Sequence, residues 1–206
     1  MTKLIIVRHC QAQGNLERFF QGRIDSDITP KGRAQIGAVT ELLSSEPIDV
    51  FYTSSLKRAR LTTDGINVYH NVPIITDDRL AEIDAGDWEG RFLTDIEQLY
   101  PQAYSDWCHN PAVFQAPGGE SIAQVYQRVG AAVDDIIRDN DGKTVCIVSH
   151  GCAIKCLMCY LHGWKVDDIA NVPLGTNTSV NILQTDGRQA PVFLMENYTD
   201  HLALIV

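Results

Sequence analysis

The stretch Leu4-Ile5-Ile6-Val7-Arg8-His9 is an unbroken apolar run that ends in a cation and a histidine. A second run of the same kind, residues 146–151, reads Cys-Ile-Val-Ser-His-Gly. Short unbroken apolar runs are typical of parallel strands that helices cover on both faces. In a parallel sheet all carboxyl ends lie at one edge, and ligands bind in the crevice there. We therefore expect His9 and His150 to meet at that edge.

The rest of the chain alternates short apolar runs with longer amphipathic ones, which predicts an α/β layered fold with a mainly parallel sheet. Thr29 and Pro30 are expected to start a helix, because Thr is a good N-cap and Pro fits the first turn. Ser54 or Ser55 is expected to cap the next helix. Further strands are expected at 49–53, 73–76, 144–148, 179–184 and 192–195, and helices at 30–44, after 55, and at about 93–100, 118–139 and 152–160.

The composition limits the ligands and locations that we expect for the chain. Lys and Arg number 17 against 26 Asp and Glu, which gives a formal charge of −9 and argues against nucleic-acid binding through a broad basic face. No apolar run approaches the ~20 residues of a membrane span. The apolar run at the N-terminus is too short for a signal peptide. We expect a cytoplasmic protein that binds no membrane, and an anionic ligand would need a local concentration of positive charge.

Three of the six cysteines, Cys152, Cys156 and Cys159, have a spacing that also occurs in iron–sulfur sites. The same i, i+4, i+7 spacing lines one face of a helix. Because the segment is apolar and contains neither Gly nor Pro between residues 152 and 160, we favour a buried helix, in which Cys packs as a small hydrophobic residue. No metal ligand set is predicted.

A third predicted strand, Val50-Phe51-Tyr52-Thr53, ends at the same sheet edge and leads into a helix that carries Arg58 in its first turn. Two histidines and two arginines, Arg8 and Arg58, are therefore expected to converge there. Arginine forms bidentate hydrogen bonds with phosphate oxygens, and a neutral imidazole can act as a nucleophile. The pattern indicates phosphate recognition.

These residues belong to motifs that resemble those of the histidine phosphatase superfamily, which includes the cofactor-dependent phosphoglycerate mutases. The blocks occur in the family's order and are spread over most of the chain. They are Arg8-His9-Cys10-Gln11-Ala12-Gln13-Gly14-Asn15, residues 20–32, Thr53-Ser54-Ser55-Leu56-Lys57-Arg58-Ala59, residues 80–90, Pro117-Gly118-Gly119-Glu120-Ser121, and Ser149-His150-Gly151.

The resemblance implies a phosphoglycerate mutase-like, three-layer α/β/α sandwich and a phosphohistidine intermediate on His9. It implies that Arg8, Arg58 and His150 hold the phosphoryl oxygens and that Glu82 protonates the leaving alkoxide and then activates water. Positioning and charge neutralisation by side chains then replace Mg²⁺, so no metal or cofactor is expected. The residues expected at the substrate are Asn15, Gln21, Gly22 and Gly151.

Three functions remain open at this point. A phosphatase for small phosphomonoesters is favoured, because the segment between Glu82 and Gly118 is shorter than the insertion of the mutases. A cofactor-dependent phosphoglycerate mutase is the first alternative, and an inactive phospholigand-binding protein is the second. Neither the physiological phosphomonoester nor the oligomeric state can be read from the sequence.

The length of 206 residues suits one domain, residues 1–206, from which an excursion at about 77–117 extends over the active site. The excursion contains two tryptophans, three prolines and several turn residues. Its sequence contains no motif that indicates which substrate is bound.

Cys10 departs from the family pattern, which most often has Gly after the nucleophile. The first interpretation is that Cys is small enough for the backbone to approach the phosphate. The second is redox control, because a thiol beside two cations is expected to have a lowered pKa and to oxidise readily.

Overall fold

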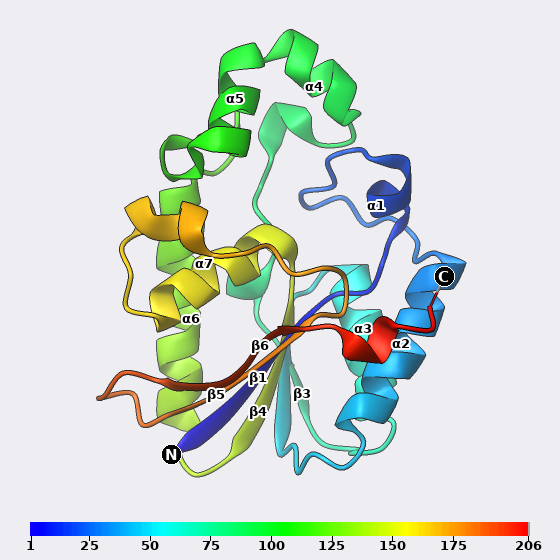
Figure 1. Ribbon diagram of the computed structural model, residues 1–206, viewed down its shortest axis with the longest axis vertical. Helices are drawn as coiled ribbons and strands as arrows, with labels where there is room; N and C mark the ends of the chain where they lie inside the picture. The colour runs from blue at the N-terminus through cyan, green and yellow to red at the C-terminus, as the bar shows by residue number, and fades with distance from the viewer. Residues whose placement is uncertain (206) are drawn as a thin grey trace.

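A six-stranded sheet forms the centre of the computed structural model, which describes residues 1–205 (Figure 1). The strand order is β3-β2-β4-β1-β5-β6. The four strands from β3 to β1 are parallel, and β5 is antiparallel to both of its neighbours, β1 and β6. The predicted mainly parallel sheet is confirmed. The strands are β1 (Thr2–Arg8), β2 (Val50–Thr53), β3 (Ile74–Thr76), β4 (Thr144–Ser149), β5 (Val180–Thr185) and β6 (Val192–Tyr198).

Helices cover both faces of the sheet, with α2 and α3 on one side and α6 and α7 on the other (Figure 1). The predicted three-layer sandwich is confirmed. No helix among residues 1–205 is long and apolar enough to cross a membrane. The helices are α1 (Gln13–Glu17), α2 (Pro30–Leu43), α3 (Lys57–Asn67), α4 (Leu93–Leu99), α5 (Pro101–His109), α6 (Ile122–Asp139) and α7 (Gly151–Leu161).

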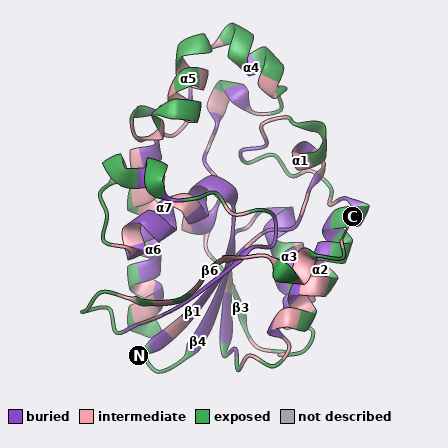
Figure 2. Ribbon diagram, viewed as in Figure 1, coloured by how far each residue is buried: buried purple, intermediate pink, exposed green. Residues whose placement is uncertain are grey.

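The apolar run of β1 divides its side chains between the two faces of the sheet. Leu4 and Ile6 belong to the core cluster that includes α6 and α7, whereas Ile5 and Val7 belong to the cluster with α2 and α3. All four side chains have no exposed surface. Because successive side chains of a strand point to opposite faces, an unbroken apolar run is what a strand between two helical layers requires. Figure 2 shows this buried central layer.

One predicted helix start is confirmed, and one predicted cap is wrong. Thr29 Oγ1 accepts a hydrogen bond from the Gly32 N–H at 2.9 Å, with Pro30 as the first helical residue of α2. Helix α3 has Leu56 as its N-cap residue, without a side-chain cap. Ser54 lies too far upstream, and its hydroxyl instead contacts His150 Nε2 at 2.7 Å.

The three clustered cysteines lie on α7, as the helical interpretation predicts. Cys156 and Cys159 have no exposed surface and Cys152 is 8 % exposed. All six cysteines of the chain are free thiols. No group of three or more His, Cys, Asp or Glu residues placed to hold a metal ion occurs in the described part of the chain.

The segment from residue 77 to residue 117 leaves the sheet and forms α4, α5 and short 3₁₀ turns beyond its carboxyl edge (Figure 1). Its outer surface is largely exposed (Figure 2). Trp88 anchors it, since this side chain is fully buried and its ring centroid lies 5.0 Å from that of Phe114 and 5.4 Å from that of Phe20. The helix predicted at about 93–100 is confirmed as α4, whereas α5, which begins at Pro101, was not assigned from the sequence.

We predict that Trp88→Ala lowers the free energy of unfolding by about 3–5 kcal/mol, the usual cost of removing a buried aromatic side chain. Leu99→Ala on α4 is the control, because Leu99 is 59 % exposed and exposed substitutions usually change stability by less than about 0.5 kcal/mol. Urea denaturation measures both. Equal, small effects would contradict the anchoring role of Trp88.

Candidate active site

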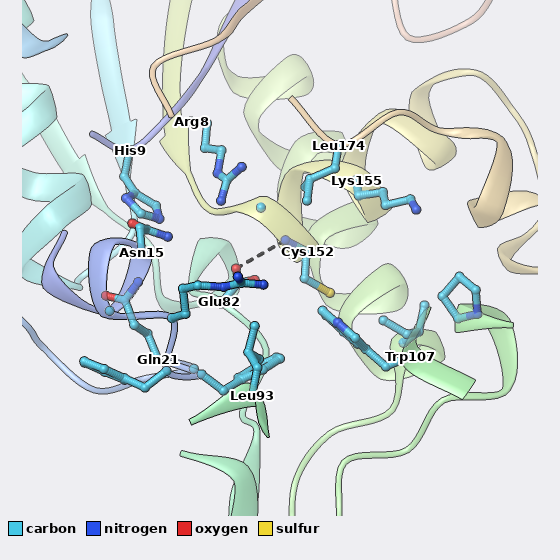
Figure 3. A pocket seen from close by; sticks show the side chains of 18 of the residues that line it. Arg8, His9, Asn15, Gln21, Glu82, Leu93, Trp107, Cys152, Lys155 and Leu174 are labelled. Carbon is cyan, nitrogen blue, oxygen red and sulfur yellow. Dashed lines mark hydrogen bonds between the residues drawn. The ribbon is translucent and has the colours of Figure 1, made fainter. Parts of the chain in front are cut away.

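A cavity of about 550 Å³ lies at the carboxyl edge of the sheet, between β1, the start of α7 and the α4–α5 segment. Figure 3 shows its lining from close by. One predicted site residue, His150, is absent from the lining and is fully buried. The other predicted site residues all line it: Arg8, His9, Asn15, Gln21, Gly22, Arg58, Glu82 and Gly151.

His9 and His150 come together because β1 and β4 are neighbouring parallel strands whose last residues, Arg8 and Ser149, are paired. The backbone N–H of His9 donates to the Ser149 carbonyl oxygen at 2.9 Å. The two imidazole centroids are 5.0 Å apart. The predicted meeting of the two histidines is confirmed, with His9 at the cavity and His150 behind it.

The His9 ring has a defined tautomer. Its Nδ1 lies 2.6 Å from the Cys10 carbonyl oxygen. A carbonyl oxygen only accepts hydrogen bonds, so Nδ1 carries the proton and donates it. Nε2 then carries the lone pair. Nε2 forms no hydrogen bond with any of residues 1–205. It is also not one of the fully buried atoms without a partner, so it is exposed to the cavity that His9 lines.

Electrostatics keep His9 neutral. Burial lowers the pKa of His9 well below its usual value, and the positive charges of Arg58 and Arg8 lower it further. The hydrogen bond to Cys10 opposes this shift. A neutral imidazole with a free Nε2 lone pair is the form that can attack an electrophile.

Two guanidinium groups flank His9. Arg58 is 1 % exposed and donates to the carbonyl oxygens of Ile24 and Gly22, both at 2.8 Å. Arg8 donates to the Gly175 carbonyl oxygen. The Nε of each guanidinium is buried and has no hydrogen-bond partner within residues 1–205. Burial lowers the pKa of both side chains, but arginine stays charged in proteins.

Neither guanidinium has a carboxylate within ion-pair distance among residues 1–205. Backbone carbonyl dipoles hold Arg8 and Arg58 in place without neutralising them. This supplies the local positive charge that an anionic ligand requires in a chain with a net charge of −9.

His150 supports His9 from behind. Its Nε2 lies 2.7 Å from Ser54 Oγ, and its Nδ1 is buried without a partner among the described residues. Burial lowers the pKa of His150 well below its usual value, with further contributions from Arg58, His9 and Arg8. The ring is therefore neutral at neutral pH.

Glu82 reaches the cavity from the loop before Trp88, and its carboxylate sits at the N-terminus of α7. Its Oε2 accepts the Cys152 N–H at 3.2 Å, and its Oε1 accepts the Ala153 N–H at 3.1 Å. The first N–H groups of a helix have no partner within the helix, so Glu82 satisfies two of them. The Ile83 N–H also donates to Oε1 at 3.1 Å.

Arg128 of α6 holds the backbone of the Glu82 loop. It donates to the carbonyl oxygens of Arg79 and Ala81 at 2.7 Å and of Glu82 at 3.1 Å. Its other hydrogen bonds go to the Glu120 carboxylate, at 2.8 and 3.0 Å. The sequence motifs pointed to Glu120 but not to Arg128, which sits two helical turns further along α6 and belongs to none of the quoted blocks.

Asn15 and Gln21 present amide groups to the cavity. Asn15 Oδ1 accepts the Ala12 N–H at 3.0 Å, and Gln21 Oε1 accepts the Ser26 hydroxyl at 2.7 Å. Both oxygens are occupied, so the two NH₂ groups remain available to donate to a ligand.

Comparison with known proteins agrees with this geometry. Residues 4–198 match the profile described as the histidine phosphatase superfamily (branch 1). The chain belongs to the histidine phosphatase superfamily.

Among the relatives of this histidine phosphatase, phosphoserine phosphatase 1 of Hydrogenobacter thermophilus is 33% identical over 98% of this chain and 95% of the relative. A 2,3-bisphosphoglycerate-dependent phosphoglycerate mutase of Cytophaga hutchinsonii is 34% identical over 85% of this chain and 84% of the relative. The solved structure of Bacillus stearothermophilus YhfR is 33% identical, with a TM-score of 0.93 over 98% of this chain and 100% of that one. These matches confirm the family, the fold and the hydrolase class predicted from the sequence.

The redox hypothesis for Cys10 of the histidine phosphatase rests on a wrong premise. Cys10 has no exposed surface, and burial raises the pKa of its thiol above the usual value; a hydrogen bond with Thr62 and the charge of Arg58 only partly oppose this. Desolvation of the Cys10 thiol therefore outweighs the lowering of its pKa that neighbouring cations were expected to cause. Buried thiols with raised pKa values react slowly, which leaves small size as the role of Cys10.

The histidine phosphatase is predicted to lose stability as the pH falls below about 6.5. His9 and His150 have lowered pKa values in the folded protein, so the unfolded chain binds more protons in that range. Below about pH 6.5 each histidine contributes up to about 1.4 kcal/mol per pH unit, so the pair costs up to about 3 kcal/mol, nearly all of it between pH 6.5 and 5.5. Urea denaturation in phosphate-free buffer measures this.

His9→Gln is predicted to remove about half of that loss of stability, whereas His109→Gln, at an exposed position on α5, leaves the loss unchanged. A free energy of unfolding that stays constant between pH 7.5 and 5.5 in the unmodified protein would show that the two histidines are not held neutral.

Proposed function

We propose that the protein hydrolyses small phosphomonoesters through a phosphohistidine on Nε2 of His9. The observation that supports this most strongly is the His9 ring itself, whose Nδ1 proton is fixed on the Cys10 carbonyl oxygen at 2.6 Å. The remaining nitrogen is accessible from a cavity that Arg8 and Arg58 also line. A nucleophile between two unpaired cations suits a substrate group that is both electrophilic and negatively charged. A phosphoryl group is both.

In the first step, Arg8 and Arg58 bind the phosphoryl oxygens, together with the amides of Asn15 and Gln21. Gly22 and Gly151 let the backbone approach. A Cβ at position 151 would lie 3.3 Å from the Arg8 guanidinium, and one at position 22, where φ is +49°, would meet the Glu89 carboxylate at 2.4 Å. A side chain at position 22 would therefore be strained by the positive φ and would displace Glu89, whereas one at position 151 would press on the Arg8 guanidinium.

Bond formation between Nε2 and phosphorus breaks the bond between phosphorus and the ester oxygen. The leaving alkoxide is a strong base and needs a proton, which Glu82 supplies. The His150 ring lies 5.0 Å from the His9 ring, between centroids, and is held by Ser54. The fixed cations stabilise the charge on the equatorial oxygens without a metal ion.

In the second step, the Glu82 carboxylate takes a proton from water, and the hydroxide oxygen attacks phosphorus. The bond between Nε2 and phosphorus breaks, which returns the lone pair to His9 and releases inorganic phosphate. Three N–H donors hold the Glu82 carboxylate, and Arg128 donates to its carbonyl oxygen. Together they keep Glu82 on the side of the cavity where the alcohol leaves and water enters.

The proposal takes residues 1–206 as one catalytic domain in which the excursion at 77–117 covers the active site. Support comes from Leu93, Trp107 and Pro111, which belong to the excursion and line the cavity. A cytoplasmic location is part of the same proposal, because six free cysteines suit a reducing compartment.

A phosphoglycerate mutase remains the second candidate, since relatives of this chain carry that name. A mutase must protect its phosphohistidine from water and return the phosphoryl group to the product. Only α4, α5 and short turns lie between Glu82 and Gly118, which leaves little chain to close the site. Phosphate release from aryl phosphates against isomerisation of 3-phosphoglycerate separates the two functions, and isomerisation with little release would favour the mutase.

We predict that His9→Ala lowers kcat/KM by at least about 10³-fold, because the nucleophile is lost. Rapid quenching of the unmodified protein with a labelled phosphomonoester is expected to trap an acid-labile, base-stable phosphoprotein that the variant lacks. His109→Ala, at an exposed position outside the cavity lining, is the matched control. It is expected to hydrolyse the substrate and to form the phosphoprotein as the unmodified protein does. Hydrolysis that survives in His9→Ala would exclude the mechanism, and absence of any phosphoprotein would favour a binding-only protein.

We also predict that Glu82→Gln has a larger effect on poor leaving groups than on good ones. Glycerol 2-phosphate needs its alkoxide protonated, so its kcat is expected to fall about 10²–10⁴-fold. 4-Nitrophenyl phosphate leaves as a stabilised anion, so the loss in its phosphorylation step is expected to be much smaller. Burst kinetics measure that step separately. Equal losses for the two substrates would contradict an acid role for Glu82.

A further inference from the structure

The cavity extends well beyond the residues that would hold a phosphoryl group. Apolar side chains from separate elements form its far wall: Leu93 of α4, Trp107 of α5, Ile122 of α6 and Leu174 of the loop before β5. A cavity of about 550 Å³ lies within the usual range for sites that enclose a whole small molecule. The alcohol part of the substrate therefore has its own walls.

Two further cations line the same cavity, Arg18 and Lys155. Arg18 is exposed, whereas Lys155 is half-buried on α7, one turn after Gly151. Neither has an ion-pair partner within the described residues 1–205. Lys155 thus resembles Arg8 and Arg58 in being a charged side chain at the cavity that has no ion-pair partner among the described residues.

Figure 3 shows where this charge lies. The His9 side chain is on one side of the cavity and the Lys155 ammonium is toward the other, with Glu82 and Cys152 between them. A substrate with its phosphorus at His9 would extend its alcohol past Glu82 toward Lys155. Trp107 and Leu174 flank that path with apolar surface (Figure 3).

The rest of the lining restricts what Lys155 can bind. Glu82 is the one acidic side chain in the lining, and three N–H groups already donate to it. An ammonium group on the substrate would find no free carboxylate there. A second phosphate would call for several donors, but the N–H groups of Cys152 and Ala153 at the start of α7 are taken by Glu82. A single ammonium matches a single carboxylate charge.

We propose that Lys155 binds a carboxylate on the leaving alcohol, so that the preferred substrates are phosphate esters of hydroxy acids with an apolar body. This inference rests on the proposed phosphatase function and adds a substrate class to it. Lys155 acts on binding and orientation of the alcohol, whereas Arg8, Arg58 and His9 act on the phosphoryl group.

The test compares three aryl phosphates that differ in one group: 4-carboxyphenyl phosphate, its uncharged isostere 4-carbamoylphenyl phosphate, and phenyl phosphate. The quantity measured is the ratio of kcat/KM for the carboxylate over the amide, in the unmodified protein, in Lys155→Met and in Lys143→Met. Intrinsic differences between the leaving groups cancel when the ratio is compared between proteins. Lys143 is an exposed lysine outside the cavity lining and serves as the matched control.

We expect a ratio about tenfold higher in the unmodified protein and in Lys143→Met than in Lys155→Met, with the difference mainly in KM and smaller at high salt. A ratio that is the same in all three proteins overturns the inference while leaving the phosphatase function intact. If none of the three esters is hydrolysed, the proposed function itself is wrong, and the inference falls with it.

Discussion

The hydrogen bond from His9 Nδ1 to the Cys10 carbonyl oxygen governs what the rest of the cavity can do. It assigns the single proton of a neutral imidazole to the nitrogen at the backbone and leaves the Nε2 lone pair at the cavity. Burial and the charges of Arg58 and Arg8 then keep a second proton away, because they lower the pKa of His9. The same two cations that suppress protonation of the ring would attract the phosphoryl oxygens. One arrangement of charge therefore serves both nucleophile and ligand.

The parts of the structure that the sequence predicted are those with a local signal. The apolar runs of β1 and β4 indicated strands covered on both faces, and their terminal histidines indicated a shared edge, which the register of Arg8 with Ser149 provides. Family motifs then led to Glu82. Features that depend on contacts between distant segments were missed or wrong: Ser54 bonds to His150 instead of capping α3, and Arg128 reaches the Glu82 loop from α6. The pKa of Cys10 was expected to fall, but burial, which sequence neighbours do not reveal, raises it.

The two ends of the cavity are built from different parts of the chain. The phosphate end uses the sheet edge and the start of α7, where pairing between strands fixes the backbone. The alcohol end uses α4, α5 and the loop before β5, which are attached to the core through contacts such as those of Trp88. Glu82 lies where the two ends meet, tied to α7 by its carboxylate and to α6 through Arg128. Substitutions in α4 and α5 can therefore change which alcohol is accepted while the phosphoryl chemistry stays in place.

A crystal structure with orthovanadate tests the central claim most directly, since vanadate takes the five-coordinate geometry of phosphoryl transfer. The account predicts vanadium bonded to Nε2 of His9, Nδ1 still donating to the Cys10 carbonyl oxygen, and equatorial oxygens within hydrogen-bond distance of Arg8 and Arg58. Vanadium bonded to another side chain, or a His9 ring turned so that Nε2 faces the backbone, would contradict it.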